Sequence, residues 1–128
     1  MPVSGLGPYD ESNVFARILR GEIPSRRVYE DEWAVAFHDI APQAPVHVLV
    51  IPRGAYVSLA DFAAQAPAEA VAGFFRAVAA VAQRLGLEEP GYRILANMGR
   101  HAGQEVPHFH VHLFGGQPLG LMLARTPA

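Results

Sequence analysis

The sequence predicts an α+β domain built on a five-stranded antiparallel sheet with two helices. Five short runs are rich in β-branched and aromatic residues and are bounded by glycine, proline or other turn residues, which is typical of strands. A long alanine-rich segment between the third and fourth runs has apolar residues at helical spacing. Strands joined by short turns, then a helix, then two more strands favour an antiparallel sheet with the helices on one side.

The beginning of the chain shows no periodicity. Two glycines and two prolines fall within the first ten residues, so we expect a flexible N-terminal arm over residues 1–12. A single domain is expected over residues 13–128. Ser12 or Asn13 is suited to cap a first, short helix over residues 14–20.

The strands and the long helix follow in order. The five predicted strands cover residues 27–30, 33–39, 47–51, 92–97 and 108–114. Pro42 and Pro45 separate the second strand from the third, because proline has no N–H to donate to a sheet. The long helix is predicted over residues 67–85, with Pro67 in its first turn. Its apolar face is expected to contain Val71, Phe74, Phe75, Val78, Val81, Ala82 and Leu85.

Composition restricts the class of protein. The 128 residues are 51% hydrophobic and 17% charged, which fits one globular domain. A net charge of -2 without a basic run argues against nucleic-acid binding. The absence of cysteine excludes disulfides, thiolate catalysis and cysteine-ligated zinc. The chain shows neither a signal peptide nor an apolar run long enough to cross a membrane, so we expect a cytoplasmic protein without a membrane partner.

The segment from His108 to Phe114 contains the chemically informative pattern. Histidine occupies positions 108, 110 and 112, and apolar residues occupy the positions between them. Alternate side chains of a strand share one face, so a ligand atom is expected within reach of all three imidazoles. Histidine changes charge near neutral pH, and its neutral form is a nucleophile. The pattern predicts a phosphoester- or phosphoramide-cleaving hydrolase with His110 as the nucleophile.

Two other interpretations of the three histidines remain open. They could lie on a solvated strand face without chemistry, or they could bind zinc, with Glu105 as the only plausible carboxylate ligand. The loop before the strand favours a phosphate ligand, because the glycine at position 103 lets backbone N–H groups approach an anion closely. No phosphate-binding P-loop motif is present.

The chain resembles the histidine triad (HIT) family, and in particular its HINT branch of purine nucleotide-binding phosphoramidases. The family pattern His-φ-His-φ-His-φ-φ, where φ is apolar, matches residues 108–114 at every position. The similarity extends over residues 13–116 and includes the segments 15–24, 37–52, 91–97 and 103–104. The resemblance implies a HIT-like fold that pairs as a homodimer into a ten-stranded sheet.

The resemblance also implies catalytic roles. His110 would attack the α-phosphorus of a nucleotide and form a nucleotidyl-histidine intermediate, and His112 would assist the leaving group. His108 and His47 would support His110. No metal or other cofactor would be needed, and the partner would be a purine nucleotide substrate, an AMP or GMP conjugate.

A nucleotide pocket follows from the same resemblance. Asp39 would accept hydrogen bonds from the ribose hydroxyls. Apolar side chains would line the base pocket, namely Phe15, Ile18, Ile23, Phe37, Ile40 and Leu49. The phosphate would be held by Asn97, Gly103, Gln104 and Val106. Glu105 and the more peripheral His38 complete the candidate nucleotide-binding residues. From the residues alone, a place in the core is favoured for Phe15, Ile18, Phe37 and Leu49, and Asp39 fits a turn cap equally well.

The chain departs from the family pattern at three places. Glu105 replaces a serine that eukaryotic members have next to the phosphate, and a carboxylate there would repel phosphate unless it points away. Ala55 stands where a histidine is often found. The tail from Gln117 to Ala128 lacks the tryptophan-containing end of eukaryotic members, which leaves the leaving-group preference open.

The function predicted from the sequence is hydrolysis of nucleoside 5′-monophosphoramidates or related adenylates, with release of AMP or GMP. Three alternatives are kept: a dinucleoside polyphosphate hydrolase, a metal-dependent phosphohydrolase, and a non-catalytic nucleotide-binding or interaction module.

Overall fold

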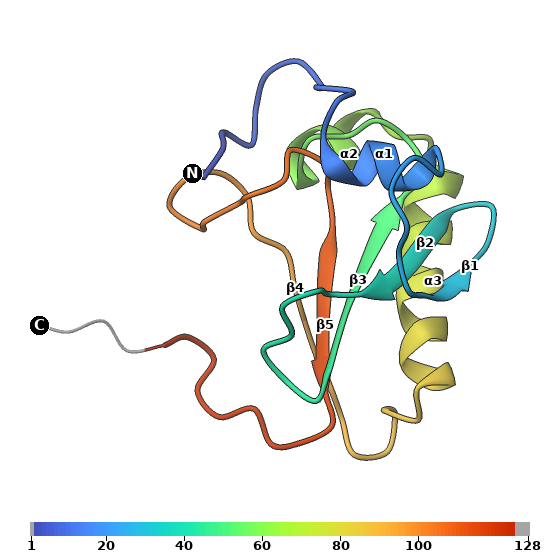
Figure 1. Ribbon diagram of the computed structural model, residues 1–128, viewed down its shortest axis with the longest axis vertical. Helices are drawn as coiled ribbons and strands as arrows, with labels where there is room; N and C mark the ends of the chain where they lie inside the picture. The colour runs from blue at the N-terminus through green and yellow to red at the C-terminus, as the bar shows by residue number, and fades with distance from the viewer. Residues whose placement is uncertain (1, 125–128) are drawn as a thin grey trace, which may run out of the picture.

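The structure, a computed structural model, describes residues 2–124 and contains one antiparallel sheet. Its strands are β1 (Arg27–Glu30), β2 (Ala34–His38), β3 (Val46–Pro52), β4 (Arg93–Leu95) and β5 (Val111–Gly115). They lie side by side in the order β1-β2-β3-β5-β4 (Figure 1). The predicted α+β class and five-stranded antiparallel sheet are confirmed.

The prediction of two helices is wrong, because the described residues form three. They are α1 (Val14–Leu19), α2 (Leu59–Gln65) and α3 (Ala68–Arg84). Helix α2 is short, and the break at Ala66 and Pro67 separates it from α3. Its sequence signal is a capping box, in which Ser58 accepts from the first turn and the Asp61 carboxylate accepts from the backbone of Ser58.

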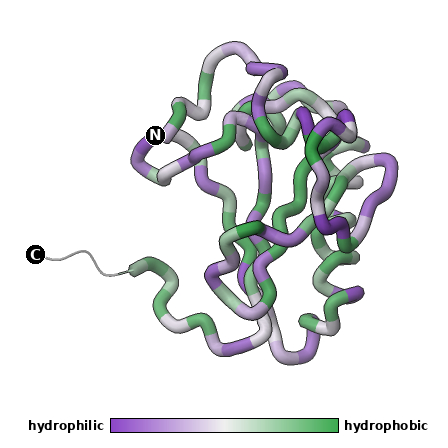
Figure 2. Tube along the Cα trace, viewed as in Figure 1, coloured by the Kyte–Doolittle hydropathy of each residue, from purple (hydrophilic) through white to green (hydrophobic). Residues whose placement is uncertain are grey.

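The helices cover both faces of the sheet, which corrects the expectation that they lie on one side. Helices α2 and α3 contribute Phe62, Phe74, Ala77, Val78, Val81 and Ala82 to the main core, against Ala34, Ala36, Val48, Val50, Val111 and Leu113 of the strands. On the opposite face, Phe15 and Ile18 of α1 pack with Val35, Phe37, Leu49 and Ile51. Figure 2 shows the hydrophobic stretch along β3, in the middle of the sheet. Alternation along β2 and β3 therefore divides their residues between two apolar clusters.

Several predicted boundaries differ from the structure. Strand β5 begins at Val111 and not at His108, because the backbone N–H of Phe109 donates to the carbonyl of Tyr56 (2.7 Å), in the segment between β3 and α2. Strand β4 is three residues long and not six. Phe75 does not lie on the buried face of α3, since 41% of it is exposed.

The N-terminal segment lies against the domain. The backbone N–H of Val3 donates to the carbonyl of Gln104 (2.7 Å), and the hydroxyl of Ser58 donates to the carbonyl of Gly5 (2.6 Å). The mobility expected for residues 1–12 stays a prediction. The expected domain ends at residue 128, and residues 125–128 lie outside the described part of the chain. Within the described part, no helix is long and apolar enough to cross a membrane.

Candidate functional site

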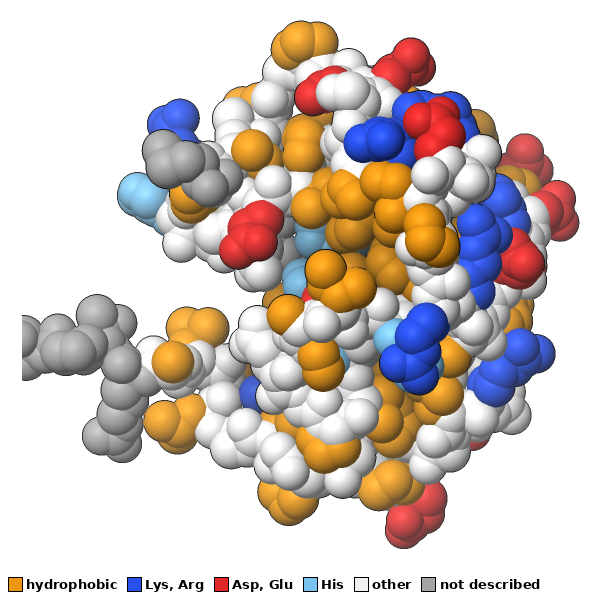
Figure 3. All heavy atoms as spheres, in the orientation of Figure 1, with side chains coloured by type: hydrophobic (Ala, Val, Ile, Leu, Met, Phe, Trp, Pro, Cys, Tyr) orange, Lys and Arg blue, Asp and Glu red, His pale blue; other side chains and the backbone are white. Residues whose placement is uncertain are grey.

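The candidate site lies on the sheet face that α1 partly covers. In the antiparallel register, Leu49 of β3 is opposite His112 of β5, and His47 is opposite Phe114. Directly paired residues point to the same face, so His47 and His112 lie on the side of Leu49, away from the main core. In Figure 3 histidine side chains appear at the base of a hollow, with apolar side chains beside it.

His110 is almost completely buried, with 7% of it exposed. Its Nδ1 lies 2.7 Å from the backbone carbonyl of His108. A carbonyl oxygen only accepts, so Nδ1 carries the proton and Nε2 keeps its lone pair. The ring of Phe15 packs edge-on against the imidazole, with 5.0 Å between centroids. Burial lowers the pKa of His110, which favours the neutral, nucleophilic form.

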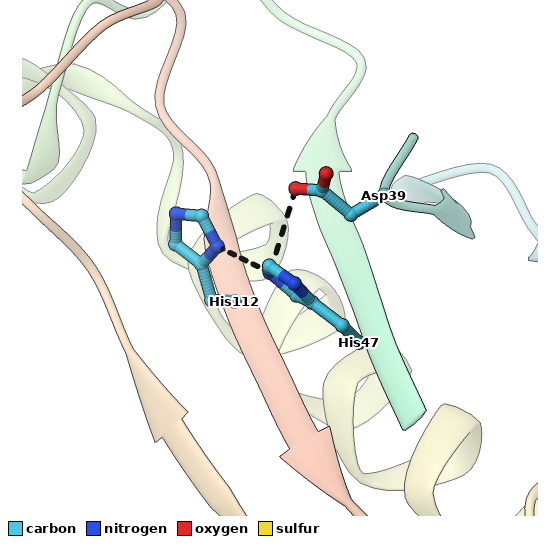
Figure 4. Close-up of side chains that lie close together, drawn as sticks. All are labelled: Asp39, His47 and His112. Carbon is cyan, nitrogen blue, oxygen red and sulfur yellow. Dashed lines mark hydrogen bonds and ion pairs between the residues drawn. The ribbon is translucent and has the colours of Figure 1, made fainter. Parts of the chain in front are cut away.

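His112 of β5, His47 of β3 and Asp39, which follows β2, form a chain of polar contacts: a hydrogen bond between the two imidazoles and an ion-pair contact between His47 and Asp39 (Figure 4). The backbone N–H of Gln43 donates to Nδ1 of His47 (3.1 Å), so a neutral His47 carries its proton on Nε2. That nitrogen lies 2.9 Å from Nδ1 of His112 and 3.4 Å from Oδ2 of Asp39. The neutral His112 then accepts at Nδ1 and presents an N–H at Nε2, which points away from His47 in Figure 4.

Both imidazoles of this chain favour the neutral state in the free protein. Burial lowers the pKa of His112 to about 4, with the neighbouring His110 and His47 as further causes. Burial also lowers the pKa of His47, against the attraction of the Asp39 carboxylate.

His108 lies on the same side but is out of reach of a ligand, which corrects the expectation for all three imidazoles. Its ring is completely buried. Nε2 faces the carbonyl of Pro52 at 3.0 Å, and Nδ1 faces the hydroxyl of Tyr9 at 2.6 Å. Burial lowers the pKa of His108 to about 4. Its contribution to the site is therefore the backbone carbonyl that orients His110.

Most of the predicted base-pocket residues form one apolar cluster. Phe15, Ile18, Phe37 and Leu49 are buried together, and Ile23 and Val106 pack against them. Ile40 is different, because it is fully exposed in the loop after β2. Asp39 has the turn-cap role as well: its Oδ1 accepts from the backbone N–H of Ala41 (2.8 Å), while Oδ2 faces His47.

The Gln104 side chain is not available to a phosphate. It is buried, accepts from the backbone N–H of Gly99 (2.9 Å), and donates to the carbonyls of Val57 (2.8 Å) and Val106 (3.1 Å). Gln104 thus closes the loop instead of binding the ligand. The backbone N–H groups of Gly103 and Gln104 are bonded to Arg100 and Gly99.

Two other N–H groups of this loop remain available. Those of Glu105 and Val106 have no protein acceptor within residues 2–124. The Glu105 side chain is exposed, and its charge opposes the lowering of the pKa of His110. Asn97 and His38 are partly exposed, and His101 is exposed.

The metal alternative has geometric support at one place. One ligand atom each of Asp39, His47 and His112 lies within 4.8 Å of the others. Tetrahedral zinc with bonds of about 2.0–2.1 Å needs ligand atoms about 3.3 Å apart. In this structure the two imidazole nitrogens are bonded to each other at 2.9 Å, so an ion has to replace that bond. Among residues 2–124, this is the group of side chains that could hold a divalent cation, and its carboxylate is Asp39 and not the expected Glu105.

Tyr9 is the contact residue that sequence reasoning missed. It lies in the segment expected to be a loose arm, and a single tyrosine before a helix carries no motif. The contact between His108 and Pro52 also joins residues that are far apart in the sequence, and no local sequence pattern indicates it.

An antiparallel five-stranded sheet with three alternating histidines at the start of its fourth spatial strand defines a histidine triad protein. Comparison with protein families supports this class, because residues 20–119 match the HIT domain. The chain belongs to the HIT family.

Individual relatives cover nearly the whole chain. A 13.2 kDa HIT-like protein of Azospirillum brasilense is 61% identical over 91% of this chain and 96% of its own. The purine nucleoside phosphoramidase of Escherichia coli K12 is 46% identical over 89% of this chain and 95% of its own. Among solved structures, a HIT family hydrolase from Clostridium thermocellum is 40% identical, with a TM-score of 0.82 over 90% of this chain and 99% of its own.

Proposed function

We propose that this protein hydrolyses purine nucleoside 5′-monophosphoramidates or related adenylates and releases AMP or GMP. The observation that carries the proposal is the geometry of His110: a buried imidazole whose Nδ1 faces the carbonyl of His108 at 2.7 Å, which leaves the lone pair on Nε2. Burial lowers the pKa of His110 and so favours its neutral form. The similarity to the E. coli purine nucleoside phosphoramidase supports the substrate class.

The first step forms a bond between Nε2 of His110 and phosphorus and breaks the P–N bond of the substrate. The departing amine needs a proton, which His112 is placed to supply from Nε2. His112 is neutral in the free protein, and the negative phosphate raises its pKa when bound, because an opposite charge favours the imidazolium. The negative charge of Asp39 raises the pKa of His112 and so favours the imidazolium that forms.

In the second step water attacks the same phosphorus. The oxygen of this water forms a new bond to phosphorus, and the bond between phosphorus and Nε2 of His110 breaks. One proton of the water goes to His112 and replaces the proton that the amine took. A reaction in two displacement steps suits an amine, which is a poor leaving group, because the amine departs before water enters. The N–H groups of Glu105 and Val106 are available to donate to phosphate oxygens throughout.

Replacement of His110 tests the proposal. His110→Ala should lower kcat by at least about a thousandfold, the scale expected for loss of a nucleophile, while AMP binding stays measurable by calorimetry. His101→Ala is the matched control, because that histidine is exposed. Mass spectrometry of wild-type protein quenched during turnover should detect a nucleotidyl adduct on His110.

The same assays separate the alternatives. Turnover by His110→Ala close to wild type would refute covalent catalysis. Loss of wild-type activity on dialysis against a chelator would favour the metal-dependent reaction at Asp39, His47 and His112. Faster cleavage of diadenosine polyphosphates than of phosphoramidates would favour the dinucleotide hydrolase, and tight AMP binding without turnover of any adenylate would favour a binding module.

We also propose that two copies pair through β4 into a ten-stranded sheet. Strand β4 is an edge of the sheet, and Ile94 on it is 45% exposed. An apolar edge strand with unpaired backbone groups favours pairing with a second edge.

A further inference from the structure

We propose that Tyr9 is a positioning residue of this site, which fixes the ring of His108 and, through that residue, the orientation of His110. The inference rests on the proposed function, since it concerns the same nucleophile. It starts from one contact: the Tyr9 hydroxyl lies 2.6 Å from Nδ1 of a completely buried His108. The two rings also meet edge-on, with centroids 5.6 Å apart.

The direction of this hydrogen bond is determined by the opposite side of the ring. Nε2 of His108 faces the carbonyl of Pro52, so it carries the proton of the neutral imidazole. Nδ1 is then an acceptor, and the Tyr9 hydroxyl donates to it. Burial raises the pKa of Tyr9, which keeps the hydroxyl protonated. The Tyr9 hydroxyl donates to one side of the His108 ring and the Pro52 carbonyl accepts from the other side. These two hydrogen bonds together prevent the ring from rotating.

Tyr9 is held in place by the structure that begins α1. Asp10 follows it and accepts at Oδ1 from the backbone N–H of Ser12 (2.9 Å). Asn13 donates from its side chain to the carbonyl of Asp10 (2.7 Å) and caps the helix by accepting from Ala16 (2.9 Å). The turn and the helix cap therefore set the position of Tyr9 relative to Phe15, six residues further along the chain.

The coupling from His108 to His110 is short. The carbonyl of His108 accepts from Nδ1 of His110 and thereby exposes the Nε2 lone pair. Phe15 packs edge-on against both imidazoles, at centroid distances of 6.2 Å to His108 and 5.0 Å to His110. A His108 ring that loses its Tyr9 contact gains freedom to turn, and its carbonyl and the Phe15 ring no longer hold a single position for His110.

Tyr9→Phe tests the inference, because it removes only the hydroxyl. Tyr29→Phe is the matched control: it also removes one hydroxyl hydrogen bond, to Asp31 (2.7 Å), at β1 on the far edge of the sheet. With a nucleoside phosphoramidate as substrate, Tyr9→Phe should lower kcat about fivefold, the scale of one hydrogen bond, with KM unchanged. Tyr29→Phe should leave both constants as in wild type.

Nitrogen-15 NMR of the imidazoles gives a readout that does not depend on turnover. In the wild type, Nδ1 of His108 should have the chemical shift of an unprotonated, hydrogen-bonded nitrogen, and in Tyr9→Phe it should move toward that of a free one. His110 should keep Nδ1–H in the wild type and show exchange broadening in Tyr9→Phe.

Three results would overturn the inference. These are a wild-type His108 without a hydrogen bond at Nδ1, an unchanged kcat in Tyr9→Phe, or equal losses of kcat in the two tyrosine variants. A wild-type protein that hydrolyses no phosphoramidate refutes the proposed function instead, and the NMR measurement then still decides whether Tyr9 holds His108.

Discussion

A single backbone carbonyl determines which nitrogen of His110 keeps its lone pair. The carbonyl of His108 binds Nδ1–H, and the tautomer that results has its lone pair on Nε2. His112 has the opposite tautomer, because His47 donates to its Nδ1. Two adjacent imidazoles, with centroids 5.1 Å apart, thus hold different tautomers because of their hydrogen-bond partners, which fits the separate roles that we propose for them.

The pKa values predict how activity depends on pH. Burial lowers the pKa of His110 below the ordinary 6.5, so the neutral nucleophile persists as the pH falls to 6.5 and is lost only at lower pH. The acid side of the kcat/KM profile should therefore have an apparent pKa below 6.5. The check is a profile from pH 4.5 to 8, read as a property of the coupled imidazoles and not of one group.

An NMR titration of the free protein serves as the control for ionisation of the substrate. If the ring signals of His110 titrate at 6.5 or above, the assignment of a neutral nucleophile fails.

At the scale of elements, the close approach of α3 to the residue before β2 depends on a glycine. A Cβ at Gly73 would lie 2.4 Å from the indole of Trp33. Gly73→Ala gains about 1 kcal/mol of helix propensity, but overpacking costs about 1–3 kcal/mol. We expect a net loss of about 1 kcal/mol in the free energy of unfolding, measured by urea denaturation.

The double variant separates these two effects. In a Trp33→Ala background the indole is gone, so Gly73→Ala should stabilise by about 1 kcal/mol. Destabilisation of the same size in both backgrounds would show that Trp33 is not the cause.

Elements with a strong local pattern were predictable, and those set by tertiary contacts were not. The β-prone run predicted over residues 47–51 and the helical pattern predicted over residues 67–85 locate β3 and α3 within one residue at each end. Helix α2 was missed because its seven residues carry only a capping box and one buried side chain, Phe62. The start of β5 was wrong because Phe109 bonds to Tyr56, a partner that no local pattern indicates.

The candidate site shows the same division. The alternation of histidines was sufficient to place His110 and His112 on one side of the sheet. It did not indicate that the ring of His108 is enclosed, or that the Gln104 side chain closes its own loop. Both are consequences of burial, where each polar group needs a partner from elsewhere in the chain.

At the scale of the whole molecule, the exposed edge at β4 predicts a dimer. Arg93 donates to the carbonyls of Gly120 and Leu121 (both 3.1 Å) and holds the C-terminal segment beside this edge. Leu121, Met122 and Leu123 are exposed there. Ile94→Glu should convert a dimer into a monomer, because it places a charge in the pairing surface.

Sedimentation velocity measures this change. Leu59→Glu is the control, since it also charges an exposed apolar residue, 46% exposed, but on α2. A wild-type monomer at micromolar concentration, or a dimer that survives Ile94→Glu, would exclude pairing through β4.

The side chains of β5 alternate between the two faces of the sheet, and this alternation limits where the sequence tolerates insertions. Val111 and Leu113 fill the main core while His112 faces the opposite side. Because the side-chain period of a strand is two, one residue added between 111 and 112, inside the strand, would move His112 and Leu113 to opposite faces. The imidazole of His112 would then have to enter the apolar interior and Leu113 would have to leave it, so this strand tolerates added residues in pairs, and single added residues only in the loops that flank it.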